Sequence, residues 1–378
     1  MSGVSLAGEV RLRPGGPLPT VHSTRPDVAA PLTRGRKAAD LPALLAAVFT
    51  LCSQAHRLTA QQAVAAARGE VLDAPLPERQ ALQAATAREH LLRMAHDWPR
   101  QLDGVTLGMV TADLRGCPLW SDALPVAARL AALPAWLQAH WLGVPVQAWL
   151  DRQADDPRWA TAWCEAQRHA SPVAALLWRH RADAMDAQAP ARPLALLDAP
   201  AVTLPLLAQR MAERPRFCAE PDWHGEPAET GPWTRTLDAG MSVPDNAWMR
   251  LIARLADLLR LAQPAGARRL ARGALALGQY AAVAWTEMAR GLLVHRVQLD
   301  AGGERVTDCR VLAPTDWNFH PRGTLAQALV PLHGPRALAQ ARCLAAAFDP
   351  CVEFRIESIQ SLVGRPSAAN NGTAPCTN

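Results

Sequence analysis

Apolar side chains recur at helical spacing along most of this 378-residue chain, and this periodicity restricts its fold more than any other feature. Leu41, Leu44, Leu45 and Val48 are typical of one helical face, and they predict a helix over residues 41–68 that ends at Gly69. Comparable patterns predict further helical stretches: Pro77–Arg100 with its end near Pro99, several short helices separated by prolines over 122–185, Pro244–Gln263, Arg268–Arg290 and Gly334–Phe348. The sequence therefore predicts a mainly helical fold.

A different pattern appears late in the chain, where apolar and polar residues alternate. Leu292–Leu299 and Arg305–Leu312 are two such runs, and Ala301-Gly302-Gly303 lies between them as a turn signal. One more strand is expected at Glu9–Leu12. The predicted class is therefore α+β, mainly helical, with a small antiparallel β element.

Composition divides the chain into three parts. Residues 1–40 are rich in proline, glycine and arginine, and we expect an irregular N-terminal arm. Residues 41–363 carry the helical and alternating patterns and are expected to form one domain. Residues 364–378 are rich in serine, asparagine, glycine and proline, and we expect a disordered tail.

Charge and cysteine usage exclude several classes of protein. The net charge of +5 comes from scattered arginines, whereas a nucleic-acid interface would gather them on one face. No run of 18 uncharged apolar residues and no signal peptide is found, so we expect no membrane span. None of the eight cysteines forms a C-x-x-C pair, which favours a cytoplasmic protein with reduced thiols.

Two cysteines stand in patterns that can carry chemistry. Cys52 and His56 are four residues apart and would share a helical face, and Cys351 follows Asp349-Pro350 just beyond a predicted helix end. Two thiolates from opposite ends of the chain can meet at one soft metal. Spacing alone leaves the alternative open that both cysteines pack in the core.

Five segments then resemble the large subunit of nickel–iron hydrogenases. They match its motifs C-G-x-C-x-x-x-H, E-x-G-P-x-x-R, E-A-P-R-G with L-x-H, P-T-x-W-N-x-x-P-R and D-P-C-x-x-C, in that order. The matching segments are Phe49–His56, Glu229–Arg235, Glu287–His295, Pro314–Arg322 and Asp349–Phe354. The resemblance implies a degenerate nickel–iron hydrogenase large-subunit-like fold.

The departures from these motifs concern the metal ligands. In the hydrogenases each cysteine pair gives one terminal nickel ligand and one ligand that bridges nickel and iron. Here Phe49 and Phe354 replace one cysteine of each pair, while Cys52 matches a bridging ligand and Cys351 a nickel-terminal one. The family's N-terminal proton-relay glutamate corresponds to Ala7. A phenyl ring cannot ligate a metal, so no nickel is expected.

The resemblance also implies an environment for iron. In the family, residues matching Arg290 and Thr315, which follows Pro314, donate hydrogen bonds to cyanide ligands of iron. Phe49 and Phe354 would add an apolar wall suited to carbon monoxide. We therefore expect Cys52 and Cys351 to be metal ligands for a transiently bound iron with cyanide and carbon monoxide.

Each remaining site residue has an ordinary structural alternative. His56 is expected beside the ligands or as a hydrogen-bonded structural histidine, and Arg290 beside the iron or in a salt bridge to Glu287. Thr315 could instead make a local turn bond near Asp316. Pro314, Asp349 and Pro350 would shape the loops near the site, and Glu229 and Arg235 would tie loops together.

The pattern resembles the HupK/HoxV type of hydrogenase maturation protein. It implies a non-enzymatic scaffold that receives the Fe(CN)2(CO) unit from the iron-delivery complex of the maturation proteins and passes it to the apo large subunit. One alternative is a metal-free module that binds the hydrogenase assembly machinery. The other is a degenerate hydrogenase with residual redox activity.

Overall fold

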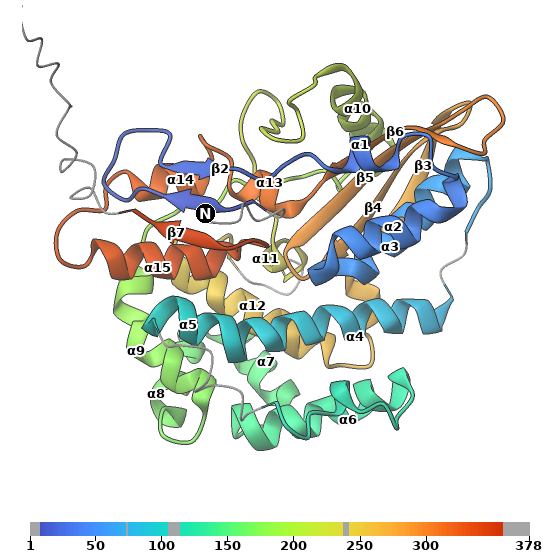
Figure 1. Ribbon diagram of the computed structural model, residues 1–378. Coiled ribbons are helices and arrows are strands. Elements are labelled where there is room, and N and C mark those ends of the chain that lie inside the picture. The colour runs from blue at the N-terminus through green and yellow to red at the C-terminus, as the bar shows by residue number, and fades with distance from the viewer. Residues whose placement is uncertain (1–7, 73–74, 105–113, 237–241, 358–378) are drawn as a thin grey trace, which may run out of the picture.

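Helices form most of this computed structural model, which describes residues 8–72, 75–104, 114–236 and 242–357 (Figure 1). The helices are α1 (Ala29–Thr33), α2 (Leu41–Val48), α3 (Ser53–Ala67), α4 (Leu76–Leu92), α5 (Trp98–Asp103), α6 (Val126–Leu137), α7 (Val146–Asp155), α8 (Trp159–Gln167), α9 (Pro172–Asp186), α10 (Pro200–Glu213), α11 (Pro232–Thr236), α12 (Ala247–Leu261), α13 (Pro314–Asn318), α14 (Thr324–Leu329) and α15 (Ala337–Phe348). The strands are β1 (Val10–Leu12), β2 (Val21–Ser23), β3 (Arg272–Gly278), β4 (Ala281–Met288), β5 (Gly291–Leu299), β6 (Val306–Leu312) and β7 (Phe354–Ile356). The predicted α+β class, mainly helical, is confirmed.

The largest sheet is an antiparallel meander in the order β3-β4-β5-β6. The predicted β5–β6 hairpin is confirmed, but the helix predicted over Arg268–Arg290 is wrong, because that segment forms β3 and β4. Its many alanines favour a helix locally, yet Gly278 and Tyr280 have positive φ and turn the chain into a hairpin. Pairing of β4 with both neighbours then overrides the propensity.

This sheet is buried on both faces by helices. Ala282 and Ala284 of β4 belong to the main core beside α3, whereas Val283 and Trp285 point to a smaller core that contains α10 residues. All eight residues of β4 are therefore buried. The absence of a solvent-facing side explains why β4 lacks the alternating pattern of a half-buried strand.

The helical half surrounds α12, which packs against α4, α7, α9 and α15 (Figure 1). Every residue of α12 except Met249 is buried. Arg250, Arg254 and Asp257 of this helix consequently need charged partners inside the protein. They find them in the loops that surround the candidate site, as described below.

The two ends of the chain meet in a second sheet of order β2-β1-β7. β1 is antiparallel to β2 and parallel to β7, with Val10 opposite Phe354 (Figure 1). The strand predicted at Glu9–Leu12 is confirmed as β1. Residues 8–40 are thus not an irregular arm, since they contribute two strands, α1 and buried core residues. The predicted tail, 364–378, lies outside the described residues.

Several helix boundaries differ from the prediction. The helix expected over 41–68 is broken between α2 and α3, and its two halves meet at 107°. Pro99 does not end the next helix, because a π-helical turn over Arg93–Asp97 leads into α5 with Pro99 in its first turn. The later boundaries at Gly69 and Phe348 are as predicted.

No single helix among the described residues is long and apolar enough to cross a membrane. The bent pair Ala38–Val48 and Thr50–Ala67 passes that test of length and composition only when its two halves are taken together. Ten of the fifteen residues of α3 are buried against the protein core.

Candidate functional site

Cys52 lies at the bend between α2 and α3, where its backbone precedes the first turn of α3. The 3-10 turn Thr50–Cys52 changes the chain direction, and the Cys52 N–H donates to the Phe49 carbonyl at 3.2 Å. Its side chain is half-buried. The bend thereby presents the thiol at a corner of the fold instead of along a continuous helix.

Cys351 lies in the short loop between α15 and β7 and is also half-buried. Asp349 ends α15 in the left-handed region at φ 55°, and its N–H donates to the Ala345 carbonyl at 3.0 Å. Pro350 prevents the helix from continuing. The following strand β7 is fixed by its pairing with β1.

The two cysteine segments lie side by side, as the sequence predicted. Thr50, Leu51 and Ser53, which flank Cys52, and residues 350–354 contribute to the wall of one cavity of about 830 Å³. Burial raises the pKa of the Cys52 thiol above its usual range, and the negative charges of Glu89 and Cys351 add to that shift. The thiols of Cys52 and Cys351 therefore share one electrostatic environment.

A buried charge cluster stands next to these thiols. The Asp349 carboxylate lies 3.0 Å from Arg254 Nη1, 3.1 Å from Arg93 Nε and 3.4 Å from Arg290 Nε. Although burial raises the pKa of Asp349, the three arginines hold it below its usual range. Arg290 also pairs with Glu89 of α4. Asp349 therefore remains ionised and fixes the guanidinium of Arg290.

Arg290 occupies the tight turn between β4 and β5. Gly291, the next residue, has φ 125°, and a Cβ atom there would come within 2.5 Å of Thr230 Oγ1. Arg290 Nη2 is buried and has no hydrogen-bond partner among the described residues. An unsatisfied cationic donor beside two thiols fits an anionic acceptor such as a cyanide nitrogen.

Arg290 does not form the salt bridge to Glu287 that was the structural alternative. Both residues lie around a strand end, so the helical spacing assumed for them does not exist. Glu287 instead accepts a hydrogen bond from the Ala271 N–H at 3.0 Å. Burial raises the pKa of Glu287 to about 7.

His56 lies between Phe49 and His295. The rings of Phe49 and His56 stack with centroids 4.1 Å apart, and His56 Nδ1 is 3.1 Å from His295 Nε2. Burial lowers the pKa of both histidines, that of His295 to about 3. Both rings are therefore neutral, and His56 has the packing of a structural residue next to the bend that carries the thiol.

The Pro314-Thr315 turn supplies a buried hydroxyl at the start of α13. The local turn bond considered for Thr315 is made by Asp316, which accepts from the Ala313 N–H at 2.8 Å. Asp316 also pairs with Arg25 of the N-terminal segment. Arg25 was not among the predicted site residues.

Glu229 and Arg235 tie loops together behind the site. Glu229 accepts from Arg250 Nη2 at 2.7 Å and from Nε at 2.8 Å, which fastens its loop to α12. Arg235 pairs with Asp257 and donates to the Met288 carbonyl at 3.0 Å. These contacts stabilise the β4–β5 turn without involving the thiols.

The cavity wall also includes Phe354 on β7, while Phe49 packs against the core on His56. Among the described residues no group of three or more histidine, cysteine, aspartate or glutamate side chains is arranged to hold a metal ion. A metal held here by Cys52 and Cys351 must therefore bring most of its own ligands.

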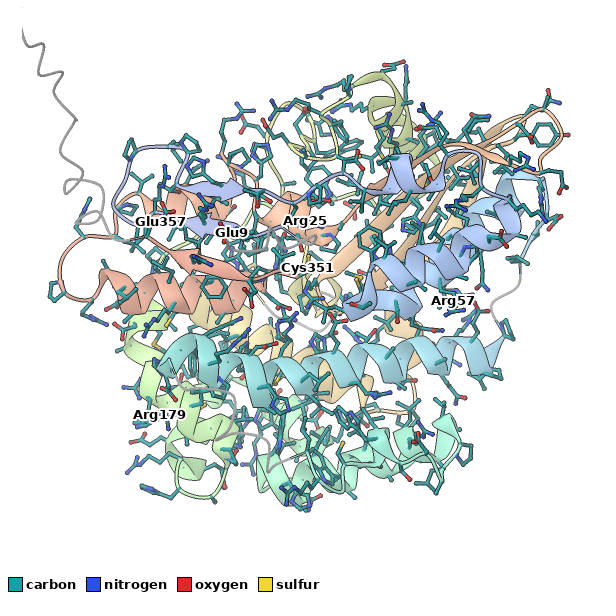
Figure 2. All side chains as sticks on the ribbon, in the orientation of Figure 1. Glu9, Arg25, Arg57, Arg179, Cys351 and Glu357 are labelled. Carbon is teal, nitrogen blue, oxygen red and sulfur yellow. The ribbon has the colours of Figure 1, made fainter. Side chains whose placement is uncertain are left out.

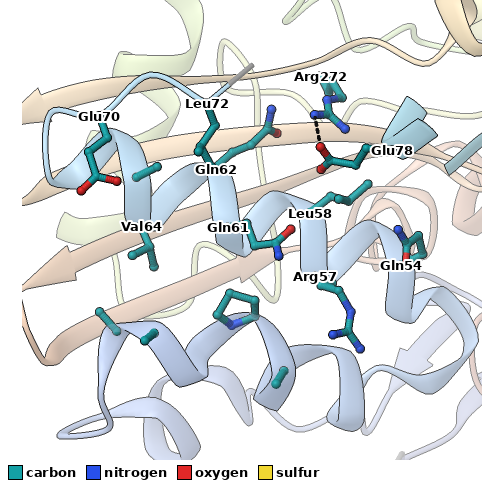
Figure 3. A pocket seen from close by; sticks show the side chains of 15 residues that line it. Gln54, Arg57, Leu58, Gln61, Gln62, Val64, Glu70, Leu72, Glu78 and Arg272 are labelled. Carbon is teal, nitrogen blue, oxygen red and sulfur yellow. Dashed lines mark ion pairs between the residues drawn. The ribbon is translucent and has the colours of Figure 1, made fainter. Parts of the chain in front are cut away.

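A second cavity, of about 660 Å³, lies beside α2 and α3 (Figure 3). Gln54, Arg57 and Gln61 line it, and Arg272 Nη2 lies 3.4 Å from Glu78 in the same wall. None of the predicted site residues contributes to that wall. The predicted residues Pro350, Cys351 and Phe354 instead line the cavity of about 830 Å³, which is therefore the candidate site.

Three site residues besides Arg25 could not be found from motifs. Glu89, Arg93 and Arg254 come from α4, the π-helical turn and α12, and they reach the site only through helix packing. The sequence feature that could have indicated these residues is a charged residue on a helix face that is otherwise buried. Arg254 shows this feature most clearly.

Comparison with known proteins places this geometry in a family. No family model matches the chain. It is 37% identical to the hydrogenase expression/formation protein HoxV of Cupriavidus necator, over 95% of this chain and 97% of that protein. It is 33% identical to the hydrogenase expression/formation protein HupK of Bradyrhizobium diazoefficiens, over 88% and 91%. It is 32% identical to HupV of Azotobacter chroococcum, over 93% and 98%.

Solved structures show the fold. A [NiFeSe] hydrogenase variant from Desulfovibrio vulgaris Hildenborough matches with a TM-score of 0.53 at 15% identity, covering 88% of this chain and 92% of that one. An NAD+-reducing [NiFe]-hydrogenase matches with a TM-score of 0.51 at 18% identity, covering 88% and 91%. The chain has the fold of the hydrogenase large subunit. It belongs to the family of hydrogenase expression/formation proteins that includes HoxV and HupK.

Proposed function

We propose that this protein is a non-catalytic scaffold of hydrogenase maturation that transiently carries an Fe(CN)2(CO) unit. Cys52 and Cys351 bind the iron, and the unit then passes to the apo large subunit. The names of its relatives support a role in hydrogenase expression or formation. The cargo is what the resemblance to the hydrogenase large subunit implies, and the chemistry of the site supports it.

The observation that carries the proposal is the buried Nη2 of Arg290, which has no hydrogen-bond partner among the described residues. Although burial lowers the pKa of Arg290, Asp349 and Glu89 raise it, and Cys351 and Cys52 add to that shift, so both sulfurs lie within its electrostatic reach. Burial of an unsatisfied cation costs free energy unless an acceptor arrives. A cyanide ligand on iron held by the two thiolates is such an acceptor.

Charge favours the same cargo. Iron(II) with two cyanides is neutral, and binding to two thiolates gives a dianionic complex. Arg290, fixed by Asp349 and Glu89, supplies positive charge next to it. Soft thiolates also prefer such a metal centre to a hard cation.

Nickel is not part of the proposal. The residues at the two positions where the hydrogenases have further cysteines are Phe49 and Phe354, and neither can bind a metal. Two thiolates, with Phe354 in the cavity wall, suit a unit that carries its own ligands and must later leave. A holding site weaker than the four-cysteine site of the recipient gives the transfer its direction.

The proposed partners are the iron-delivery complex and the apo large subunit, both in the cytoplasm. A carrier with the fold of the recipient can present the same face to the donor. This part of the proposal requires that the protein receives no iron unit in cells without the delivery complex.

Infrared spectroscopy of the protein purified from a maturation-competent host tests the proposal. We expect cyanide and carbonyl stretching bands, together with iron and without nickel. Protein from the same host lacking the delivery complex should show neither band. Absence of the bands in both preparations would favour the metal-free interaction module, and hydrogen uptake with a viologen dye would instead favour the degenerate enzyme.

A further inference from the structure

Arg25 follows β2 in the N-terminal segment and is 291 residues away in sequence from its partner Asp316. Its side chain is only 16% exposed. In the view of Figure 2, Arg25 and Cys351 are labelled in the same region of the fold. Although burial lowers the pKa of Arg25, the negative charges of Asp316, Cys351 and Cys52 raise it. A second guanidinium therefore lies within electrostatic reach of both sulfurs.

The need to anchor the N-terminal segment does not explain why the Arg25 side chain lies where it does. The segment is already fixed by the β1–β2 and β1–β7 pairings and by the Gly35 N–H, which donates to the Val306 carbonyl at 2.8 Å. Exposed ion pairs would serve equally well for anchoring at little desolvation cost. A half-buried arginine within electrostatic reach of two thiols needs another reason.

The two arginines differ in the number of carboxylates with which they form ion pairs. Arg290 pairs with both Asp349 and Glu89, whereas Asp316 is the only carboxylate in an ion pair with Arg25 among the described residues. Asp316 is itself held by the Ala313 N–H. It can therefore aim the Arg25 guanidinium while leaving other N–H groups of that planar fork to donate elsewhere.

We propose that Arg25 is a second positioning residue of the cargo site and donates a hydrogen bond to one of the two cyanide ligands of the iron unit. This inference rests on the proposed function and adds to it. The unit carries two anionic diatomic ligands, and two arginines from different elements lie within electrostatic reach of the sulfurs that would hold it. Arg290, in the β4–β5 turn, donates a hydrogen bond to one cyanide. Arg25, in the N-terminal segment, donates to the other.

The test compares Arg25→Gln with Arg13→Gln in full-length protein purified from the maturation-competent host. Arg13 lies in the same segment and makes a 2.7 Å ion pair with Glu357, so its variant controls for weakened anchoring. We expect Arg25→Gln to lose iron about tenfold faster or more, because a hydrogen bond to a charged group is removed. One cyanide band should shift, while the Arg13→Gln spectrum stays like the wild type.

The same iron retention and unshifted cyanide bands in Arg25→Gln would overturn the role of Arg25 and leave the proposed function intact. Absence of cyanide bands in the wild-type protein would overturn both. Circular dichroism shows whether Arg25→Gln folds. If it does not, Arg25→Lys takes its place under the same criteria, since lysine keeps the charge beside Asp316 but not the planar guanidinium.

Discussion

The ring of Phe49 lies stacked on the imidazole of His56, with centroids 4.1 Å apart and planes inclined by 12°. Phe49 stands where the hydrogenase motif has a cysteine, so this stack fills a position that could hold a ligand. Phe354, at the other replaced position, lines the cavity beside Cys351. Phenyl rings therefore occupy both replaced positions, and the candidate site has two thiols instead of four.

Restoring the two missing thiols should create a metal site. We expect Phe49→Cys/Phe354→Cys to bind one zinc ion tightly, because four thiolates complete a tetrahedral ligand set. Equilibrium dialysis with metal analysis measures it. Phe319→Cys/Phe354→Cys, which puts one thiol at a buried position in the core, is the matched control. Equal zinc binding by both double variants would contradict the proposed arrangement.

Removing either site thiol should abolish cargo retention and leave the fold nearly unchanged. Cys52→Ala and Cys351→Ala each delete one sulfur at a half-buried position, which costs about 1–2 kcal/mol or less. Iron content, circular dichroism and hydrogenase maturation in cells measure the outcome. Cys164→Ala, at a fully buried position, controls for packing loss. Maturation at the wild-type rate in both site variants would show that the protein acts without a bound unit.

Neutralising Asp349 should destabilise the protein strongly. Asp349→Asn leaves Arg254, Arg93 and Arg290 without the carboxylate they share, and breaking a buried ion pair costs about 3–5 kcal/mol. Urea denaturation measures the change in the free energy of unfolding. Asp183→Asn removes a pair to the half-exposed Arg336 and should cost less than about 1 kcal/mol. Similar losses in the two variants would mean that the cluster does not stabilise the fold.

Acidification should weaken the fold through His90. Burial outweighs the nearby Asp257 and lowers the pKa of His90 to about 4. The unfolded chain, with an ordinary pKa of about 6.5, takes up a proton first, so stability is complete above that value and falls as the pH decreases toward 4. This contribution amounts to about 2 kcal/mol between pH 7.5 and 5.

His90→Gln should remove that part of the pH dependence. A glutamine amide can still donate to the Asp257 carboxylate, which accepts from His90 Nε2 at 2.8 Å. Urea denaturation of wild type and variant at both pH values provides the comparison. The same loss of stability on acidification in both proteins would assign the effect to other groups.

Sequence patterns predicted the parts of the fold in which local propensity and tertiary packing agree. The helix ending at Phe348 carries its own stop signal in Asp349-Pro350, and the β5–β6 hairpin carries its glycine turn. β4 could not be predicted in this way. Its residues are buried on both faces, so alternation disappears and alanine favours a helix until the neighbouring strands pair with it.

The residues of the candidate site also differ in whether the sequence could predict them. The resemblance to the hydrogenase motifs predicted Cys52, Cys351 and Arg290 as site residues, and each of them lies at a turn. Arg25 and Glu89 lie in segments without such a signal, and they reach the site through strand pairing and helix packing between distant parts of the chain. Charged partners of this kind are visible only when the tertiary structure is known.

The pairing of β7 with β1 has a consequence for synthesis on the ribosome. Cys351 directly precedes β7, and that strand is fixed by a partner at the opposite end of the chain. Translation produces Cys52 about 300 residues before Cys351. The segments that carry Cys52 and Cys351 are therefore held together only after β7 has been made and has paired with β1.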